Sequence, residues 1–350
     1  MCRANSQGGR RCKGCQATAA RDAHNFRRRL NRAIKAEALE RAQAAGLPST
    51  KIAILKQLPP GHAKQWALEN GLAPGNTGGD IAPKPQAAAA AAAQAPEPVP
   101  SGPAAGAPPE VREQAAALMA LQGTHPDEGQ LLSKEVSEIG FIGGGVNTTN
   151  RVVFTDGTVG FHKPFSGLND SCASAYGQQD PLQPIHEAAA WHLANCLGAR
   201  FRKLVPPCVL REVDGEIGSL AKGVTGMQGS PSKPRRAIAE DAAFFDALIG
   251  QQDRHRYNFF TEGDNIHLID HGFTFATTGD AINRSHFLEE RTRRNATRLK
   301  AFETAALKKL LASPNLHGLA DVLTPERAQA LKQRAEDMLS TGRLPAVGRY

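Results

Sequence analysis

The chain reads Asp-Arg-His-Arg-Tyr-Asn at residues 253–258 and Asp-His-Gly at residues 270–272. Carboxylate and amide oxygens are the hard ligands that Mg²⁺ prefers, which makes Asn258 and Asp270 candidate metal ligands. Asp253, which begins the first stretch, is the candidate to orient a substrate hydroxyl. These residue types therefore suit a site that holds a divalent cation beside an oxygen nucleophile. The alternative interpretation is an ordinary Asp/Asn turn beside a hairpin.

The residues around these stretches predict a loop between a helix and a hairpin. Residues 242–250 are mostly apolar and end in glycine, which is typical of the end of a helix. Residues 258–260 and 267–269 are short apolar runs around a polar turn at residues 262–265, a pattern that indicates two paired strands. Asp270 would then lie at the end of the second strand.

The order Asp-Arg-His-x-x-Asn resembles the catalytic loop of the phosphatidylinositol 3-/4-kinase-like (atypical) kinases, here of bacterial or phage type. Ordinary protein kinases carry His-Arg-Asp there. The resemblance covers roughly residues 131–345 and implies a two-lobed, α+β, protein-kinase-like fold. It implies Mg²⁺-dependent transfer of the γ-phosphate of ATP to a hydroxyl, with His255 stabilising the transferred charge. His271 departs from the Phe that is common at this position in protein kinases.

A phosphate-binding lysine is expected upstream of the loop, on a strand. Two apolar-rich runs at residues 150–155 and 158–164 flank the dipeptide Asp156-Gly157, which favours a hairpin because the turn needs positive φ. Lys163 lies near the end of the second run, in a Phe-His-Lys-Pro context that resembles the ATP-binding lysine of these kinases. An ordinary lysine at a strand end is the alternative interpretation.

A helix after this strand should carry a glutamate that pairs with Lys163. Residues 184–198 fit a helix, because apolar residues recur at helical spacing and Gly198 suits a C-terminal cap. Glu187 lies in the first turn and is the candidate partner. A glutamate there also stabilises the positive end of the helix dipole, and the two roles are compatible.

Two further segments are candidates to contact the nucleotide. The first is a glycine-rich loop before the lysine hairpin, made of Gly143, Gly144 and Gly145. Glycines allow backbone N–H groups to approach phosphates closely, but the pattern is neither GxGxxG nor a P-loop, so a flexible turn is an equal alternative. The second follows strands predicted at residues 208–213 and 216–224, where backbone groups from Ala221 to Val224 are the candidates to bind adenine.

Composition divides the chain into three segments. Residues 1–72 form a basic N-terminal module, residues 73–110 a linker rich in Ala and Pro, and residues 111–350 the kinase-like catalytic domain. The linker contains seven consecutive alanines and no amphipathic pattern to bury. This composition predicts a flexible, poorly packed connection, so the N-terminal module is a flexible extension of the catalytic domain.

The positive charge of the chain is concentrated at its N-terminal end. Residues 1–80 contain 14 Lys and Arg against 5 Asp and Glu, a net +9, whereas the whole chain carries +8. Residues 81–350 therefore carry −1. This basic arm is a candidate to bind nucleic acid or an acidic protein, although charged runs are more often solvated surfaces.

Cys2, Cys12, Cys15 and His24 are a candidate zinc site in this arm, because thiolate and imidazole ligands suit Zn²⁺. The spacing from Cys2 is irregular and no second Cys-x-x-Cys follows, so reduced thiols are the favoured alternative. The other cysteines are scattered, which argues for a reducing compartment. Because the start is polar and Arg-rich and no apolar run could span a bilayer, the sequence predicts a cytoplasmic protein.

The chain after Gly272 is expected to complete the C-terminal lobe with amphipathic helices at residues 297–312 and 325–340. Arg291 and Arg293 lie before these helices, where a kinase of this type meets its acceptor. They suit a phosphorylated or acidic acceptor, but a solvated helix is the favoured interpretation.

Two other functions fit the same residues. A non-catalytic nucleotide-binding module would keep the pocket as a structural ligand site while the basic arm binds nucleic acid or an acidic partner. The same fold could also transfer AMP instead of phosphate. Fold and motifs do not specify the acceptor, so hydroxyls of a protein, a lipid and a small molecule all remain open.

Overall fold

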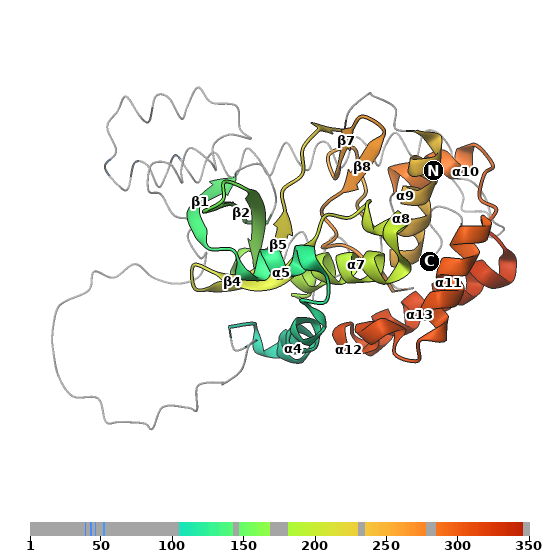
Figure 1. The fold of residues 1–350 in the computed structure, drawn as a ribbon, viewed down its shortest axis with the longest axis horizontal. Helices are drawn as coiled ribbons and strands as arrows, with labels where there is room; N and C mark the ends of the chain where they lie inside the picture. Colours follow the sequence, from blue (N-terminus) through green and yellow to red (C-terminus); the bar gives the residue numbers. More distant parts are fainter. Residues whose placement is uncertain are drawn as a thin grey trace, which may run out of the picture. The chain divides into compact units, whose positions relative to one another are not determined.

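The computed structural model describes residues 104, 106–142, 147–168, 181–229, 235–277 and 285–345, together with residues 39, 43, 46 and 52. The chain divides into two compact units, Met1–Gln94 and Ala95–Tyr350. All the helices and strands named below belong to the second unit (Figure 1).

A five-stranded antiparallel sheet forms the first lobe of this unit, with the strand order β1-β2-β3-β5-β4 (Figure 1). The strands are β1 (Val136–Ile142), β2 (Thr149–Phe154), β3 (Val159–Pro164), β4 (Cys208–Val213) and β5 (Glu216–Lys222). The β2–β3 and β4–β5 hairpins turn at Asp-Gly pairs, where Gly157 has a φ of +79° and Gly215 a φ of +78°. Glycine adopts these angles at little cost, and both predicted hairpins are confirmed.

The two faces of the sheet have different partners, because successive side chains of β3 point to opposite faces. His162 is fully buried and pairs in register with Leu220, which belongs to an apolar cluster that α5 (Pro126–Ser133) covers. Lys163 is therefore directed to the other face, on the side where α7 (Gln183–Leu197) packs against β4 and β5.

The helix α7 is the predicted helix that carries Glu187, but it begins at Gln183, so Glu187 lies beyond the first turn and not within it as expected. It is buried along most of its length and ends at Gly198, whose φ of +114° is outside the range that other residues favour. Trp191 in its middle donates its indole N–H to Glu128 Oε1 of α5 at 2.7 Å. This bond links α7 to the helix on the opposite side of the sheet.

The second lobe is mainly helical. It contains α8 (Ala199–Arg202), α9 (Arg236–Ile249), α10 (His286–Arg293), α11 (Ala301–Ala312), α12 (Leu319–Val322) and α13 (Pro325–Thr341), and a small sheet of β6 (Met227–Gln228), β7 (Phe259–Glu262) and β8 (Asn265–Leu268). One apolar core, which includes Trp191, Phe244 and Phe245, runs through both lobes. The two-lobed α+β fold expected from the sequence is confirmed.

Several boundaries differ from those read from the sequence, and two of them concern how the domain packs. The helix expected at residues 297–312 begins at Ala301, because Arg298 pairs with Arg343 in an isolated β-bridge and Lys300 forms the N-cap. Packed structure also begins before residue 111, since Ala104 and Ala107 are buried in the main core. Within the described ranges, no helix combines the length and apolarity that a bilayer crossing requires.

Candidate active site

Lys163 is the centre of an ion-pair cluster that joins the two lobes. Its Nζ donates to Glu187 Oε1 on α7 and, at 2.8 Å, to Asp270 Oδ1 after β8. The side chains of Lys163 and Glu187 are 23% and 8% exposed, whereas that of Asp270 is 44% exposed. The expected contact between Glu187 and Lys163 is therefore present, and Asp270 forms the solvent-facing end of the cluster.

The members of this cluster fix each other's charge. Burial alone would lower the pKa of Lys163, but the carboxylates of Asp270 and Glu187 outweigh it and raise this pKa above its usual range. Burial alone would raise the pKa of Glu187, but Lys163 and His271 outweigh it and hold this pKa below its usual range. At neutral pH Lys163 is thus an ammonium and Glu187 a carboxylate, the states that a phosphate-binding lysine and its partner require.

The loop from Gln251 to Asn258 links both candidate metal ligands to Asp253. Asn258 Nδ2 donates to the Asp253 carbonyl at 2.8 Å. The Gln251 side chain accepts from the backbone N–H of Asp253 at 3.0 Å and donates to the Asp270 carbonyl at 3.4 Å. These bonds hold Asp253, Asn258 and Asp270 on one connected framework.

Arg254 lies beneath this loop and is fully buried. Its Nε donates to both carboxylate oxygens of Asp246, at 3.2 and 3.3 Å, and its Nη1 donates to the carbonyls of Asn258, at 2.5 Å, and Ile269. Arg254 therefore ties the backbone at one candidate metal ligand to the residue that precedes the other. Neither Arg254 nor Asp246 was predicted from the sequence to have a role; the signal was an aspartate in the otherwise apolar end of a predicted helix.

His271 is a second buried residue to which the motif gave no role. Its backbone N–H donates to Glu187 Oε2 at 2.9 Å, and its ring Nδ1 lies 3.8 Å from the same oxygen. Burial and the nearby Arg254 lower the pKa of His271, so its ring is neutral at neutral pH. The two oxygens of Glu187 thus have separate partners, Lys163 on one side and His271 on the other.

The solvent side of the loop carries the residues that an acceptor would meet. His255 Nε2 lies 3.7 Å from Asp253 Oδ2, and the two side chains are 34% and 17% exposed. Tyr257 is 50% exposed, and the guanidinium of Arg256 lies 4.6 Å from the centre of its ring. Asp253 and His255 are therefore close together at a surface that a substrate can reach.

Asn258 and Asp270 have donor atoms that suit Mg²⁺. Because Asn258 Nδ2 donates to a carbonyl, the oxygen of the same amide is the atom that remains for a cation. Asp270 binds Lys163 through Oδ1 and has a second carboxylate oxygen. No group of three or more His, Cys, Asp or Glu side chains within the described residues is arranged to hold a metal. Two protein oxygens nevertheless fit Mg²⁺, which completes its shell with phosphate oxygens and water.

The remaining candidates from the sequence fall into two groups. The glycine loop and the zinc candidates lie outside the described residues: Gly143, Gly144, Gly145, Cys2, Cys12, Cys15 and His24. The adenine-binding candidates, Ala221 to Val224, lie within the described residues. Ala221 pairs with Phe161 of β3 and Cys208 of β4, so its backbone is already engaged in the sheet. Val224 lies beyond the strand and remains the proposed backbone contact.

Arg291 departs from the expectation of a solvated or acceptor-binding stretch, whereas Arg293 and Arg294 beside it are exposed. Arg291 is 2% exposed, and its guanidinium binds both carboxylate oxygens of Glu303, one of them at 2.9 Å. The same guanidinium donates to the carbonyls of Glu240, Ala296 and Arg298. Arg291 is therefore a structural residue, which a count of charges along the chain does not reveal.

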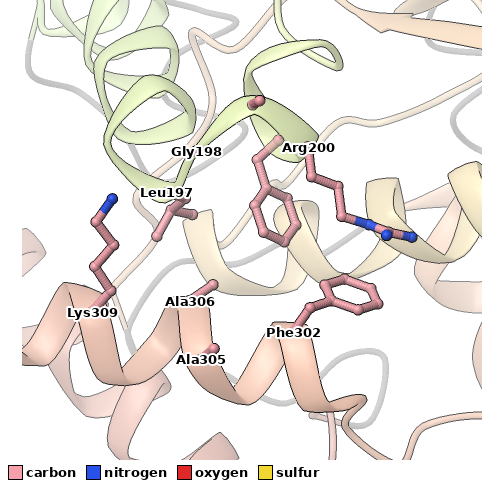
Figure 2. Close-up of a pocket in the computed structure, with 9 residues that line it drawn as sticks. Leu197, Gly198, Arg200, Phe302, Ala305, Ala306 and Lys309 are labelled. Carbon is pink, nitrogen blue, oxygen red and sulfur yellow. The ribbon is translucent and has the colours of Figure 1, made fainter.

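A cavity of about 220 Å³ lies between α8 and α11, away from these residues (Figure 2). Its lining is mainly apolar and includes Leu197, Phe302 and Ala306. Arg200 at its edge stacks 3.8 Å from the centre of the Phe302 ring and binds Asp241 at 2.7 Å. None of the proposed catalytic residues lines this cavity.

No protein-family model matches the sequence, and no curated protein matches it. Solved structures of similar fold include hydra Fam20, with 15% identity over 66% of this chain and 94% of that chain and a TM-score of 0.43. The Golgi casein kinase with Mn and ADP bound has 14% identity over 61% and 73% of the two chains and a TM-score of 0.41. The Helicobacter pylori proinflammatory kinase CtkA has 12% identity over 60% and 94%, with a TM-score of 0.34. The likeness is one of fold.

Proposed function

We propose that this domain transfers the γ-phosphate of ATP to a hydroxyl acceptor, with Mg²⁺ as the cofactor. The observation that carries the proposal is the cluster of Lys163, Glu187 and Asp270. Its third member lies on the same hydrogen-bonded framework as Asp253 and Asn258. Phosphoryl transfer needs positioning and charge from the protein rather than covalent chemistry, and these five side chains supply both.

In the proposed mechanism Lys163 holds the phosphates of the nucleotide. Glu187 binds the ammonium from one side and keeps it in place at the end of β3. The contact with Asp270 occupies the other side, which is the more exposed one. Phosphate oxygens would replace this carboxylate as partners of Lys163, and Asp270 would then be available as a ligand.

Asp253 acts on the acceptor. Its backbone is fixed by Gln251 and Asn258, and its carboxylate is partly exposed beside His255. It would accept the hydrogen bond of the attacking hydroxyl, orient the oxygen toward the γ-phosphate and take up the proton. His255 lies close enough to donate a hydrogen bond to the transferred oxygens.

Asn258 and Asp270 would hold the metal. When bound, Mg²⁺ would neutralise charge on the phosphate oxygens. The hydrogen bonds of Gln251 and Arg254 fix the backbone at Asn258 and Asp270 before metal or nucleotide binds. This preorganisation lowers the cost of assembling the site.

The test is transfer of label from ATP by the full-length protein, incubated with cell extract and Mg²⁺. The catalytic variant is Asp270→Asn, which removes one charge without changing volume. The matched control is Asp214→Asn, because Asp214 also has positive φ, +55° against +60°, but lies in the exposed β4–β5 turn. We expect transfer of γ-label by the wild type and by Asp214→Asn, and none by Asp270→Asn.

Other outcomes would replace the proposal. Transfer of label from the α position would mean nucleotidyl transfer. Absence of transfer from either position, with Mg²⁺-dependent binding of ADP intact, would favour a non-catalytic nucleotide-binding module. Equal turnover in Asp270→Asn and the wild type would remove Asp270 from the site.

A further inference from the structure

The segment that follows β8 holds an unusual backbone conformation beside the proposed site. It runs from Asp270 to Thr277 without helix or strand, yet most of it is buried. Asp270 and Phe275 have φ values of +60° and +54°. Aspartate adopts such an angle more readily than most residues, but a bulky side chain such as that of Phe275 keeps it only where its surroundings impose it. The orientation of Asp270 therefore depends on what holds this segment.

Two arginines of α13 bind the far end of the segment. Arg327 Nη1 donates to the carbonyl of Phe275 at 3.0 Å, and Arg334 Nη1 donates to the carbonyl of Ala276. The two arginines are only 5% and 7% exposed. Burying a guanidinium costs desolvation free energy, and hydrogen bonds to carbonyls offset this cost. An apolar side chain would fill the same positions of α13 without that cost, so these carbonyl contacts are part of what the two arginines contribute.

Arg334 also binds the end of α9. Its Nε donates at 3.0 Å to the carbonyl of Leu248, one of the last carbonyls of that helix, which have no partner within the helix. The contact is close: a Cβ added at Gly250 would lie 2.9 Å from Arg334 Cζ and 3.1 Å from the backbone nitrogen of Ala276. Three parts of the chain thus meet at one guanidinium.

The two segments that carry the proposed site residues, one leading to Asp253 and one containing Asp270, both meet at the Arg334 guanidinium. The chain that leaves Gly250 reaches Asp253 three residues later, and Asp270 lies six residues before Ala276. Phe275 donates its backbone N–H to the carbonyl of Ile249 at 2.5 Å, and Gln251 links the two segments nearer the site. A shift of Arg334 would move the segment that leads to Asp253 relative to the segment that contains Asp270.

We propose that Arg334, together with Arg327, is a positioning residue that sets the orientation of Asp270 and so the affinity for nucleotide with Mg²⁺. The proposal rests on the proposed function of this site. Both arginines act through main-chain carbonyls and not by touching a substrate. In other metal sites, loss of the groups that orient the ligands weakens metal binding about 10- to 100-fold.

The experiment compares Arg334→Lys with Arg291→Lys in the full-length protein. Arg291 is the control, because it is also buried and also forks between main-chain carbonyls, but it binds other segments and pairs with Glu303 as well. Lysine keeps the positive charge but lacks the planar guanidinium that donates to several carbonyls at once. Each variant should therefore lose hydrogen bonds to main-chain carbonyls without leaving an opposite charge unpaired. The measurements are the melting temperature, binding of a fluorescent ADP analogue in a Mg²⁺ titration, binding of the analogue without metal, and turnover.

We expect both variants to melt at lower temperature than the wild type. Only Arg334→Lys should weaken the Mg²⁺-dependent part of nucleotide binding, by about tenfold, with metal-free binding unchanged. Arg327→Lys, which leaves the bridge between Leu248 and Ala276 in place, should shift the same quantity by a smaller factor. It also serves as the test if Arg334→Lys does not fold.

An unchanged Mg²⁺ titration in both α13 variants, or an equal shift in Arg291→Lys, would overturn the positioning role. The result is separable from that of the proposed function. If no phosphate is transferred by the wild type but Arg334→Lys selectively weakens Mg²⁺-dependent ADP binding, the kinase proposal fails and the positioning role stands. If the wild type transfers phosphate and the α13 variants match Arg291→Lys, the positioning role fails and the kinase proposal stands.

Discussion

Asp246 and Asp253 lie seven residues apart in the sequence and have opposite surroundings. Asp246 is fully buried and accepts hydrogen bonds from Arg254 and, at 2.7 Å, from Ser285 Oγ. Asp253 is 17% exposed and lies beside His255 at the surface of the loop. One carboxylate is enclosed among donors that hold the loop in place, and the other is accessible to a substrate. The same residue type thus supports the site at one position and is the proposed catalytic group at the other.

The largest effect in this comparison should come from Asp253→Asn. We expect turnover to fall by about 10²- to 10⁴-fold, because the amide cannot accept the proton of the acceptor. The affinity for nucleotide with Mg²⁺ and the melting temperature should stay close to those of the wild type, since the loop framework binds Asp253 through its backbone. Single-turnover kinetics and a nucleotide titration measure the two quantities. Loss of nucleotide affinity with turnover retained would contradict the role of Asp253.

Asp246→Asn should mainly lower the stability of the fold, whereas Asp253→Asn should mainly lower turnover. It leaves the guanidinium of Arg254 buried without a full opposite charge, which typically lowers the free energy of unfolding by about 3–5 kcal/mol. Denaturant unfolding measures the change, with Asp264→Asn as the control. Asp264 pairs with Arg235 at the surface, with both side chains at least half exposed, and its loss should cost less than about 1 kcal/mol. Equal losses in the two variants would mean that Arg254 does not depend on Asp246.

The same contrast explains which features the sequence could predict. Turns at Asp156-Gly157 and Asp214-Gly215, and the end of α7 at Gly198, are local requirements for positive φ, and each was predicted correctly. The contact between Lys163 and Glu187 was also anticipated, because the resemblance fixes the order of strand, lysine and helix.

The pairing of buried charges was not predictable in this way. Arg291 belongs to a run of basic residues that looks solvated in the sequence, but it is buried against Glu303, twelve residues later. Arg334 binds a carbonyl 86 residues earlier in the chain. Such pairs depend on which segments pack together, and the local pattern of α13 gives only the face on which its arginines lie.

His162 is buried like Asp246, but unlike Asp246 it has no ion-pair partner at hydrogen-bonding distance. Burial in the apolar face of the sheet lowers its pKa from 6.5 to about 4. Between these values the unfolded chain binds a proton that the folded chain does not, so the free energy of unfolding falls as the pH falls from about 6.5 to 4. Across this range His162 lowers the free energy of unfolding by about 3 kcal/mol as the pH falls. Above pH 6.5 its effect on the free energy of unfolding does not change with pH.

His162→Leu removes this titration and suits the apolar cluster around Leu220. We expect the variant to lose less stability than the wild type between pH 7 and 4.5, because other titrating groups contribute equally to both proteins. Urea unfolding of both proteins at several pH values gives the difference directly. Parallel pH profiles would mean that the pKa of His162 is the same in the folded and the unfolded protein.

The smallest effect on the site should come from removing the N-terminal arm. All the proposed catalytic residues lie after residue 140, and Ala104 and Ala107 already belong to the core of the second unit. Deletion of residues 1–103 should therefore leave nucleotide binding and the melting temperature unchanged. Deletion of residues 1–110 serves as the control, because it also removes the two buried alanines and should lower the melting temperature.

The arm itself should matter for a polyanionic partner. Residues 1–80 carry a net +9, so the shortened protein should elute from a polyanion column at lower salt than the full chain. The difference should shrink as salt rises, because screening already weakens such contacts. If deletion of residues 1–103 abolishes nucleotide binding, the arm and the catalytic domain are not independent modules. If elution is the same for both proteins at low salt, the charge of the arm is solvated and its proposed role in binding nucleic acid or an acidic partner is wrong.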